Sequence, residues 1–389
     1  MLLRALATIP LLSWCYLLLG RGGFWRASAQ LLRGPPPVAA AGTRATAGPR
    51  IVAVIPARDE APVIGAAVRS LLLQDYAGPL HVIVIDDGSS DGTSGAAMAA
   101  AADVDASDRL TVRRGAPLPP GWTGKLWAMS QGVAAAAALR PDYLLFTDAD
   151  IHHDPGHLTA LVSRAQADGR DLVSCMVELP VVTFAEQCLV PAFVFFFLML
   201  YPPRWISSSR RSTAGAAGGC MLMRPQALVR SGGLQAIRAQ IIDDCALARI
   251  TKSAGGTVWL GLTHGARCTR SYGSFAGIGR MISRSAFNQL GHSYPLLAAT
   301  LAGLAVTYLL PPVLLLSGDG IAALLGAAAW GLMTVAYAPM VRFYRRSPLW
   351  SLCLPVIAVF YVGATAHSAL QFARRRGGLW KGRVQDLRE

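Results

Sequence analysis

From Ile51 onwards, short apolar runs alternate with segments of helical pattern, and this alternation limits the folds open to the chain. The predicted strands cover residues 51–56, 80–85, 143–147 and 172–177, and the predicted helices cover residues 63–73, 93–101 and 155–167. Strands that alternate with helices favour an α/β fold, with a mostly parallel sheet and helices on both faces. Such sheets bind their ligands at the carboxyl ends of the strands.

Two of these strands are followed directly by aspartates. Asp148 and Asp150 follow one strand, and the pair Asp86 and Asp87 follows another. Carboxylates spaced i, i+2 where a strand becomes a loop can both turn toward one hard cation. Mg²⁺ or Mn²⁺ held in this way keeps open positions for phosphate oxygens. The two acidic strand ends therefore predict a metal-assisted site for a nucleotide sugar.

The composition is too apolar for an ordinary soluble enzyme, because 53% of the residues are hydrophobic and only 15% are charged. A bilayer span takes roughly 20 residues. Apolar runs of about this length cover residues 2–20, 296–316, 321–341 and 349–372. We expect the first run to be a retained anchor rather than a signal peptide, because no convincing small-residue cleavage site precedes Arg21.

Arginines beside the apolar runs predict the topology. Those after the first run place the next domain in the cytoplasm, in a multi-pass protein of the inner (plasma) membrane. Three full C-terminal spans would put the last basic group outside, against the positive-inside tendency. A re-entrant hairpin at Pro355, or a break at Pro311 and Pro312, would avoid this conflict, and the sequence leaves the choice open.

A shorter apolar run, residues 189–203, is too short to span a bilayer. It is either an interfacial helix that admits a lipid acceptor or a buried core helix. The predicted domain division is an anchor at 1–24, a linker at 25–50, a catalytic domain at 51–290, transmembrane segments at 291–375 and a basic tail at 376–389.

The chain carries 36 Lys and Arg against 22 Asp and Glu, a formal net charge of +14. A basic excess suits nucleic acid, anionic lipid or a phosphorylated substrate. No nucleic acid is expected as a partner, because the sequence has no helix-turn-helix, zinc-finger or RNP-type signature. The seven cysteines show no CxxC spacing, so we expect reduced thiols, with no disulfide framework and no zinc site.

The first predicted strand ends in a charged segment that suits nucleotide binding. Pro56 is followed closely by Arg58, Asp59 and Glu60, which can shape a pocket for a base. The ordinary alternative is a strand-to-helix turn with acids near the helix start. The later pair of acids, Asp86 and Asp87, could accept hydrogen bonds from a uracil imide and a ribose hydroxyl, or could serve a turn and a helix cap.

These segments occur in the same order as similar segments in a known family. Ile-Pro-Ala-Arg-Asp-Glu, then Asp-Asp-Gly-Ser-Ser-Asp-Gly-Thr, then Asp-Ala-Asp resembles the family 2 glycosyltransferases of GT-A fold, over roughly residues 50–290. The resemblance implies that Asp59 and Asp87 bind the nucleotide. It also implies that Asp148 and Asp150 hold a metal–diphosphate group.

A second segment, Gly-Trp-Thr-Gly-Lys, ends at Lys125. Lys125 can meet a diphosphate, whereas the ordinary alternative is a solvated lysine at a helix start. Family members that act on isoprenoid lipids carry a similar segment, and this chain most resembles the hopene-associated glycosyltransferases of hopanoid-producing bacteria. That resemblance implies a nucleotide-sugar donor, UDP-linked, and a lipid acceptor, the hydroxyl of a hopanoid or another polyisoprenoid.

Asp243 and Asp244 stand where this family carries a Glu-Asp acceptor motif. The second acid of the motif is the catalytic base, so the resemblance implies that Asp244 is the base and that Asp243 assists it. The alternative is an acid pair that stabilises a helix N-terminus. Gly218, Gly219 and Cys220 resemble the small-residue stretch near the sugar and the acceptor.

Arg280 and Arg284 occupy the place where processive relatives carry Gln-x-x-Arg-Trp, a motif that this chain lacks. Its absence favours a single transfer over polymer synthesis. We expect that transfer to invert the configuration of the sugar. The two arginines, spaced i, i+4, could share one helix face and meet the diphosphate. A basic face on anionic lipid would explain them equally well.

Four of the seven histidines are candidate site residues. His152, His153 and His157 follow the Asp-Ala-Asp motif at a spacing that could supply metal ligands, although polar residues leading into a helix explain them as well. His264 could reach the metal or the leaving group, but a surface or core position is the commoner fate. Two other functions stay open: a carotenoid or ceramide-type lipid glycosyltransferase, and a non-catalytic nucleotide-sugar-binding membrane subunit.

Overall fold

The computed structural model describes residues 1–34 and 48–374, together with the backbone of two short strands, β9 (Leu379–Trp380) and β10 (Arg383–Val384). Much of the predicted linker and most of the predicted basic tail therefore lie outside the described residues. Contacts divide the chain into two compact units. The helical unit comprises residues 1–30, 181–205 and 272–379, and the sheet unit comprises residues 31–180, 206–271 and 380–389. The predicted domain boundaries stay predictions.

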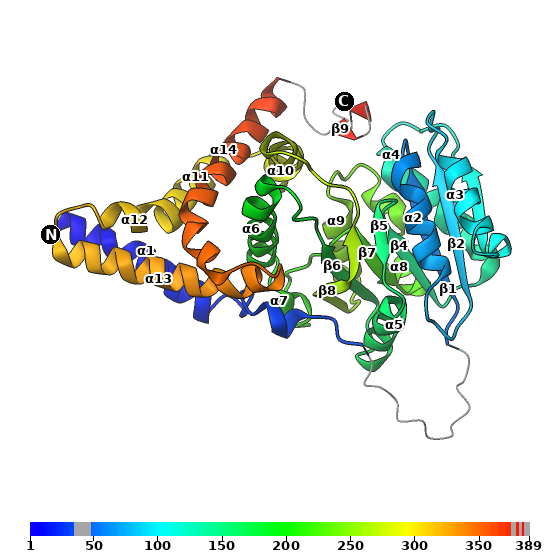
Figure 1. Ribbon diagram of the computed structural model, residues 1–389, viewed down its shortest axis with the longest axis horizontal. Coiled ribbons are helices and arrows are strands. Elements are labelled where there is room, and N and C mark those ends of the chain that lie inside the picture. Colours follow the sequence, from blue (N-terminus) through cyan, green and yellow to red (C-terminus); the bar gives the residue numbers. More distant parts are fainter. Residues whose placement is uncertain (35–47, 375–378, 381–382, 385–389) are drawn as a thin grey trace. The chain divides into compact units, whose positions relative to one another are not determined.

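The sheet unit is built on an eight-stranded sheet with the order β3-β2-β1-β4-β7-β6-β8-β5 (Figure 1). Its strands are β1 (Ile51–Ala57), β2 (Leu80–Asp86), β3 (Leu110–Arg114), β4 (Tyr143–Thr147), β5 (Ile151–His153), β6 (Leu172–Glu178), β7 (Cys220–Met223) and β8 (Val258–Cys268). Every residue of β1 and β4 is buried. These continuous apolar runs are typical of strands that are covered on both faces.

The pairing confirms the predicted α/β class and adds antiparallel strands that were not predicted. β1 lies parallel to both β2 and β4, and β6 lies parallel to β8. β7 runs antiparallel between β4 and β6, and β5 runs antiparallel to β8. β5 and β7 have three and four residues, too few for a clear alternation of apolar and polar positions.

The helices of the sheet unit are α2 (Ala61–Leu72), α3 (Thr93–Ala102), α4 (Gly124–Ala136), α5 (His157–Ala167), α8 (Pro225–Arg230) and α9 (Asp243–Ser253). The predicted helices match α2, α3 and α5 to within two residues. α4 packs closely on β1, because a Cβ at Gly132 would overlap the Val54 side chain. This close packing positions the first turn of α4, where Lys125 lies.

The helical unit contains α1 (Leu2–Leu19), α6 (Phe184–Leu200), α7 (Pro203–Ile206), α10 (Phe275–Gln289), α11 (Tyr294–Leu304), α12 (Leu310–Leu314), α13 (Gly320–Phe343) and α14 (Leu354–Ala373). Short 3₁₀ helices cover Ala27–Gln30, Ser107–Arg109, Ala137–Leu139, Leu234–Ile237 and Pro348–Cys353. By length and composition, five helical segments of the described chain could cross a membrane: Leu2–Leu19, Phe184–Ile206, Tyr294–Leu314, Gly320–Phe343 and Pro348–Ala373.

The structure resolves the role of the prolines in the C-terminal segments. Pro311 and Pro312 do not break their segment, because a π-helical turn, Ala305–Leu309, precedes them and joins α11 to α12. A π turn re-routes the backbone hydrogen bonds that proline cannot make. Pro355 lies in the first turn of α14, where the missing N–H costs nothing, so it does not interrupt this helix.

The run at 189–203 was predicted to be too short to span a bilayer. This prediction was wrong, because the helical segment is longer than the apolar run. α6 begins at Phe184, because Thr183 and Glu186 form a capping box ahead of the apolar run. With α7 it makes a segment of 23 residues. In an 18-residue stretch of that segment 67% of the residues are buried within the protein, against 17% in α1. The burial favours the core-helix alternative.

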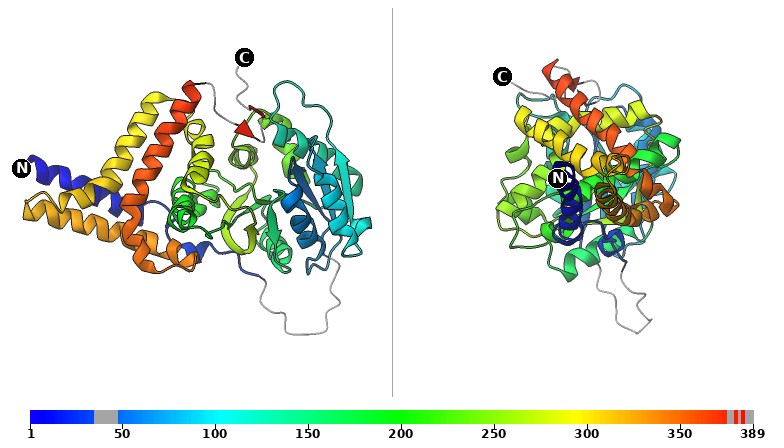
Figure 2. Two further views of the ribbon diagram at one scale, coloured as in Figure 1. Left: turned by 45° about the horizontal axis from the view of Figure 1, so that its top comes forward. Right: turned by 90° about the vertical axis from the view of Figure 1, so that its left-hand side faces the viewer.

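α1 packs within the helical unit, beside α13 (Figures 1 and 2). Trp14 is fully buried, donates from Nε1 to the carbonyl of Thr307 at 2.9 Å and meets the Tyr308 ring edge-on. Arg4 forms an ion pair at 2.9 Å with Asp319, which also caps α13. These contacts hold α1 within the helical unit, and its role as a retained anchor stays a prediction. α11 and α14 also run side by side (Figure 2).

Candidate functional site

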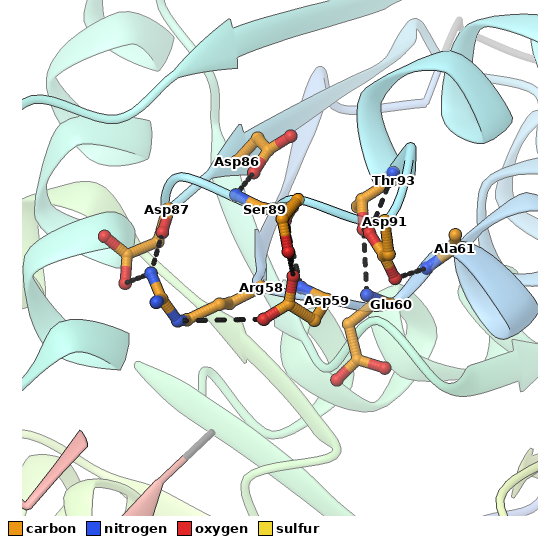
Figure 3. Close-up of polar contacts among 10 residues, drawn as sticks. Arg58, Asp59, Glu60, Ala61, Asp86, Asp87, Ser89, Asp91 and Thr93 are labelled. Atoms are coloured by element: carbon orange, nitrogen blue, oxygen red, sulfur yellow. Dashed lines mark hydrogen bonds and ion pairs between the residues drawn. The ribbon is translucent and has the colours of Figure 1, made fainter. Parts of the chain in front are cut away.

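The parallel register of β1 and β2 brings the two predicted nucleotide loops together. Ala57 pairs with Asp86, so the loops that follow the two strands start at the same edge. Arg58 Nη1 donates to the carbonyl oxygen of Asp87 at 2.5 Å and lies 3.8 Å from its carboxylate (Figure 3). The same guanidinium lies 4.0 Å from the carboxylate of Asp59. One cation thus links both acids that the resemblance assigns to the nucleotide.

The two neighbouring aspartates have different tasks. Asp86 accepts a hydrogen bond from Ser89 N at 2.7 Å and another from Ser94 Oγ, so its carboxylate organises its own loop. The carboxylate of Asp87 faces Arg58 (Figure 3). Asp86 thus has the turn role that was kept as its alternative, whereas the nucleotide contact of either aspartate stays a prediction.

Hydrogen bonds across the two loops fix the backbone around Asp59, which has a positive φ of 50°. Ser90 N donates to Asp59 Oδ1 at 2.9 Å, and Asp59 N donates to Ser89 Oγ at 3.0 Å. Asp91 accepts from Ala61 N, at the start of α2 (Figure 3). A left-handed aspartate held by its neighbours is a common feature of functional loops. Pro56 is buried within β1.

A second cluster forms around Lys125, at the start of α4. Its Nζ lies 2.9 Å from Asp148 Oδ1 and 3.2 Å from Asp243 Oδ2. Burial acts to lower the pKa of Lys125, but the two aspartates outweigh burial and raise it, so the ammonium stays charged. Lys125 therefore joins the Asp-Ala-Asp motif to the acid pair of α9, and the solvated-lysine alternative does not hold.

Asp244 is the other acid at the start of α9. Its Oδ2 accepts from Gly218 N at 2.8 Å, and its Oδ1 accepts from Cys245 N at 2.7 Å. Burial, and after it the charge of Asp243, raise the pKa of Asp244 to about 6. A carboxyl with a pKa near the working pH can both take and release a proton.

Gly218 lies between the cation and the acid of this cluster. A Cβ there would stand 3.3 Å from Lys125 Nζ and 3.4 Å from Asp244 Oδ2. The backbone therefore lies so close to these two groups that glycine fits there better than any residue with a side chain. The other two predicted pocket residues lie deeper: Gly219 packs against Val177, and the Cys220 side chain is fully buried.

Asp150 has a partner that sequence reasoning missed. Arg270 Nε lies 3.2 Å from Asp150 Oδ2, and Arg270 also pairs with the carboxylate of Glu60. Thr269 N donates to the Asp150 carbonyl at 2.8 Å, which fixes the end of β8 against the motif. Little in the sequence indicates this ion pair, because Arg270 is 120 residues from Asp150 and lies in no recognised motif.

The carboxylates of the motif suit a hard divalent cation. Burial and the neighbouring Asp148 raise the pKa of Asp150, so positive charge nearby would stabilise its ionised form. Asp148 and Asp150 offer oxygen donors from one turn at the carboxyl end of β4, which is the ligand type that Mg²⁺ and Mn²⁺ prefer.

The remaining predicted residues lie elsewhere. Arg280 and Arg284 are exposed on α10 of the helical unit, one helical turn apart. His264 Nδ1 lies 2.8 Å from a carboxylate oxygen of Glu178. In the described part of the chain, the sheet unit thus brings together Lys125, Asp148, Asp243 and Asp244 in one cluster, and Arg58, Asp59 and Asp87 in another.

Comparison with protein families bears on this arrangement. Residues 52–230 match the model of glycosyl transferase family 2. This region, which is less than half of the chain, is therefore similar to the family 2 glycosyltransferases. The matched residues include both nucleotide loops, the Asp-Ala-Asp motif, Lys125 and Gly218, but they end before Asp243. No match was found among curated protein sequences.

A solved structure confirms the predicted GT-A-like fold. A mannosyltransferase from Pyrobaculum calidifontis, PcManGT, in complex with GDP-Man and Mn²⁺, has a TM-score of 0.51 and 20% identity, and the match covers 95% of this chain and 99% of that one. Glucosyl-3-phosphoglycerate synthase from Mycobacterium tuberculosis, with Mn²⁺ and UDP-Glc, has a TM-score of 0.39 and 19% identity over 63% and 79% of the two chains. The second likeness is too weak to bear on function.

Proposed function

We propose that this chain is a membrane-bound, inverting glycosyltransferase that moves a sugar from a nucleotide-diphospho-sugar to a hydroxyl of a lipid. The observation that carries the proposal is the cluster of Lys125, Asp148, Asp243 and Asp244 within and beside a family 2 domain. The cluster combines a cation for a leaving phosphate with a carboxyl of raised pKa for the acceptor.

The donor would lie across the two groups of residues. Asp59 and Asp87, linked through Arg58, would hold the nucleoside, and the diphosphate would extend toward Lys125. Asp148 and Asp150 would hold Mg²⁺ or Mn²⁺, which supplies positive charge to the diphosphate when bound. The GDP-Man and Mn²⁺ of the Pyrobaculum structure support donor and metal use of this kind. A UDP-linked donor rests on the sequence resemblance.

Asp244 would act as the base. It takes the proton of the acceptor hydroxyl, whose oxygen attacks the anomeric carbon from the face opposite the diphosphate, so the configuration inverts. Negative charge then grows on the leaving phosphate, close to the ammonium of Lys125. Gly218 N holds Asp244 in place through its 2.8 Å hydrogen bond. Arg280 and Arg284 remain candidates for the diphosphate or for anionic lipid.

A lipid acceptor is supported by the apolar helices of the other unit. Five helical segments long and apolar enough to cross a membrane accompany the family 2 domain. We propose a multi-pass protein of the inner membrane whose catalytic domain faces the cytoplasm, with a hopanoid or another polyisoprenoid as acceptor. Both the orientation and the lipid class rest on the charge pattern and the sequence resemblance.

The test is to incubate membranes that contain the protein with labelled nucleotide sugars and Mn²⁺, and to identify the labelled lipid. We expect label in a hopanoid or polyisoprenoid extract, and none after metal chelation. Asp150→Ala should abolish this metal-dependent transfer, whereas Asp168→Asn, at a surface ion pair with Arg164, should leave it intact.

Other results would redirect the proposal. Label in a carotenoid or ceramide would correct the acceptor and keep the chemistry. Donor binding without transfer to any lipid would favour a non-catalytic subunit. Asp150→Ala protein with full turnover and unchanged metal dependence would refute the metal assignment.

A further inference from the structure

Three buried side chains meet directly behind the Asp-Ala-Asp turn. His153 is the last residue of β5, His157 is the first of α5, and Cys220 is the first of β7. None of the three is more than 3% exposed. Each offers one potential ligand atom, and these atoms all lie within 4.8 Å of one another. The proposed sugar-transfer step uses none of these side chains.

The spacing within this cluster suits a coordinated ion. Cys220 Sγ lies 3.5 Å from His157 Nε2. Ligands bound at 2.0–2.3 Å around a tetrahedral metal lie roughly 3.3–3.8 Å apart. The pair therefore already stands at coordination distance, and a small movement of His153 would complete a three-ligand face.

A threonine hydroxyl lies beside one nitrogen of each ring. Thr147 Oγ1 donates to the carbonyl of Gly219 at 2.8 Å, so it has to accept from His153 Nε2, 2.9 Å away. That hydrogen bond leaves the lone pair of His153 on Nδ1. Thr263 Oγ1 lies 3.4 Å from His157 Nδ1, on the side of the ring away from the sulfur. Metal-binding histidines are typically oriented by such hydrogen bonds at their second nitrogen.

We propose that His153, His157 and Cys220 form a buried binding site for Zn²⁺. Two imidazoles and one thiolate suit zinc, whereas Mg²⁺ and Mn²⁺ prefer oxygen. On binding, the Cys220 thiol releases its proton to solvent, and the sulfur forms a bond to the ion. This ion is distinct from the one proposed at Asp148 and Asp150, and the site does not depend on sugar transfer.

The site has a structural consequence for the neighbouring turn. Its ligands come from β5, α5 and β7, and Thr147, which holds His153, directly precedes Asp148. Bound zinc would therefore fix both ends of the Asp-Ala-Asp turn. His153 and His157 were considered from the sequence as possible ligands, but no zinc site was expected. Cys220 is 63 residues from His157, and no CxxC spacing indicated that it could be a ligand.

The test uses the full chain, purified in detergent and dialysed against excess Mg²⁺. Elemental analysis should find about one zinc per chain. After replacement by Co²⁺, the absorption spectrum should show a thiolate-to-cobalt charge-transfer band. Cys220→Ser should remove this band and weaken zinc binding at least tenfold. Asp150→Ala should keep both zinc and band, as should His152→Ala and Cys353→Ser, which change residues outside the cluster.

The decisive measurement is on the unmodified protein, so it stands even if Cys220→Ser fails to fold. Folded protein that holds no zinc and gives no thiolate band with Co²⁺ would overturn the site, leaving a thiol–imidazole hydrogen bond between Cys220 and His157. Zinc kept by Cys220→Ser but lost by Asp150→Ala would also overturn it. A chelator that lowers the melting temperature of the parent, but not that of Cys220→Ser, supports it.

Discussion

At the scale of single residues, Asp244 has the properties of a proton acceptor. It is held by two backbone N–H donors, and its neighbour Asp243 takes up the ion pair with Lys125. Sequence reasoning found all three residues, because each belongs to a recognisable motif. It could not show that they touch, since 118 residues separate Lys125 from Asp243 (243 − 125) and only the folded sheet brings them together.

The raised pKa of Asp244 predicts the pH dependence of transfer. Below its pKa of about 6 the carboxyl is protonated and cannot accept a proton. The transfer rate should therefore fall about tenfold for each pH unit below this value and level off above it. Initial rates on either side of pH 6 measure this, with nucleotide-sugar binding at each pH as the control. A rate that holds steady well into the acid range would mean that another group is the base.

Gly218 and Gly219 are adjacent, and the structure predicts different effects for them. Gly218→Ala places a methyl group 3.3 Å from Lys125 Nζ, so it should lower the turnover rate, by about tenfold to a hundredfold, with little loss of stability. Gly219→Ala meets the Val177 side chain at 3.1 Å and should instead lower the melting temperature. Equal effects of both variants on turnover would contradict the placement of Gly218.

At the scale of elements, continuous apolar runs made β1, β2, β4 and β6 predictable from the sequence. β5 and β7 were not predictable in this way, because such short strands are defined by their partners in the sheet. The start of α6 was placed too late, since a capping box and not an apolar residue begins that helix. Arg270 was missed for a related reason, because its importance comes only from its contact with Asp150.

The packing of α4 on β1 can be tested at this scale. Gly132→Ala would overlap Val54, so we expect a loss of roughly 1–3 kcal/mol of stability and a displacement of the helix that carries Lys125. Gly95→Ala on α3 is the matched control. Apart from its neighbours in the same helix, no atom lies within 4 Å of the added Cβ. It should be neutral or stabilise by about 0.5–1 kcal/mol. Thermal unfolding of both variants measures the difference, and equal melting temperatures would contradict the close packing.

At the scale of the whole molecule, two kinds of structure are joined in one chain. The sheet unit carries clustered acids and cations in a region that matches the family 2 glycosyltransferase model, and the helical unit carries apolar segments suited to a bilayer. The motifs predicted the first kind of structure, and the apolar composition predicted the second. The acceptor was not predictable from composition, because apolar helices accept many lipids, and its class rests on resemblance.

The central claim is that this combination transfers a sugar and does not merely bind one. Binding of a nucleotide sugar and its transfer to lipid should therefore be measured in one preparation of Asp244→Asn protein. Loss of transfer by about 10²–10⁴-fold, with donor binding unchanged, is the result that we predict. Transfer at the parent rate would contradict the role of Asp244 and the proposed chemistry with it.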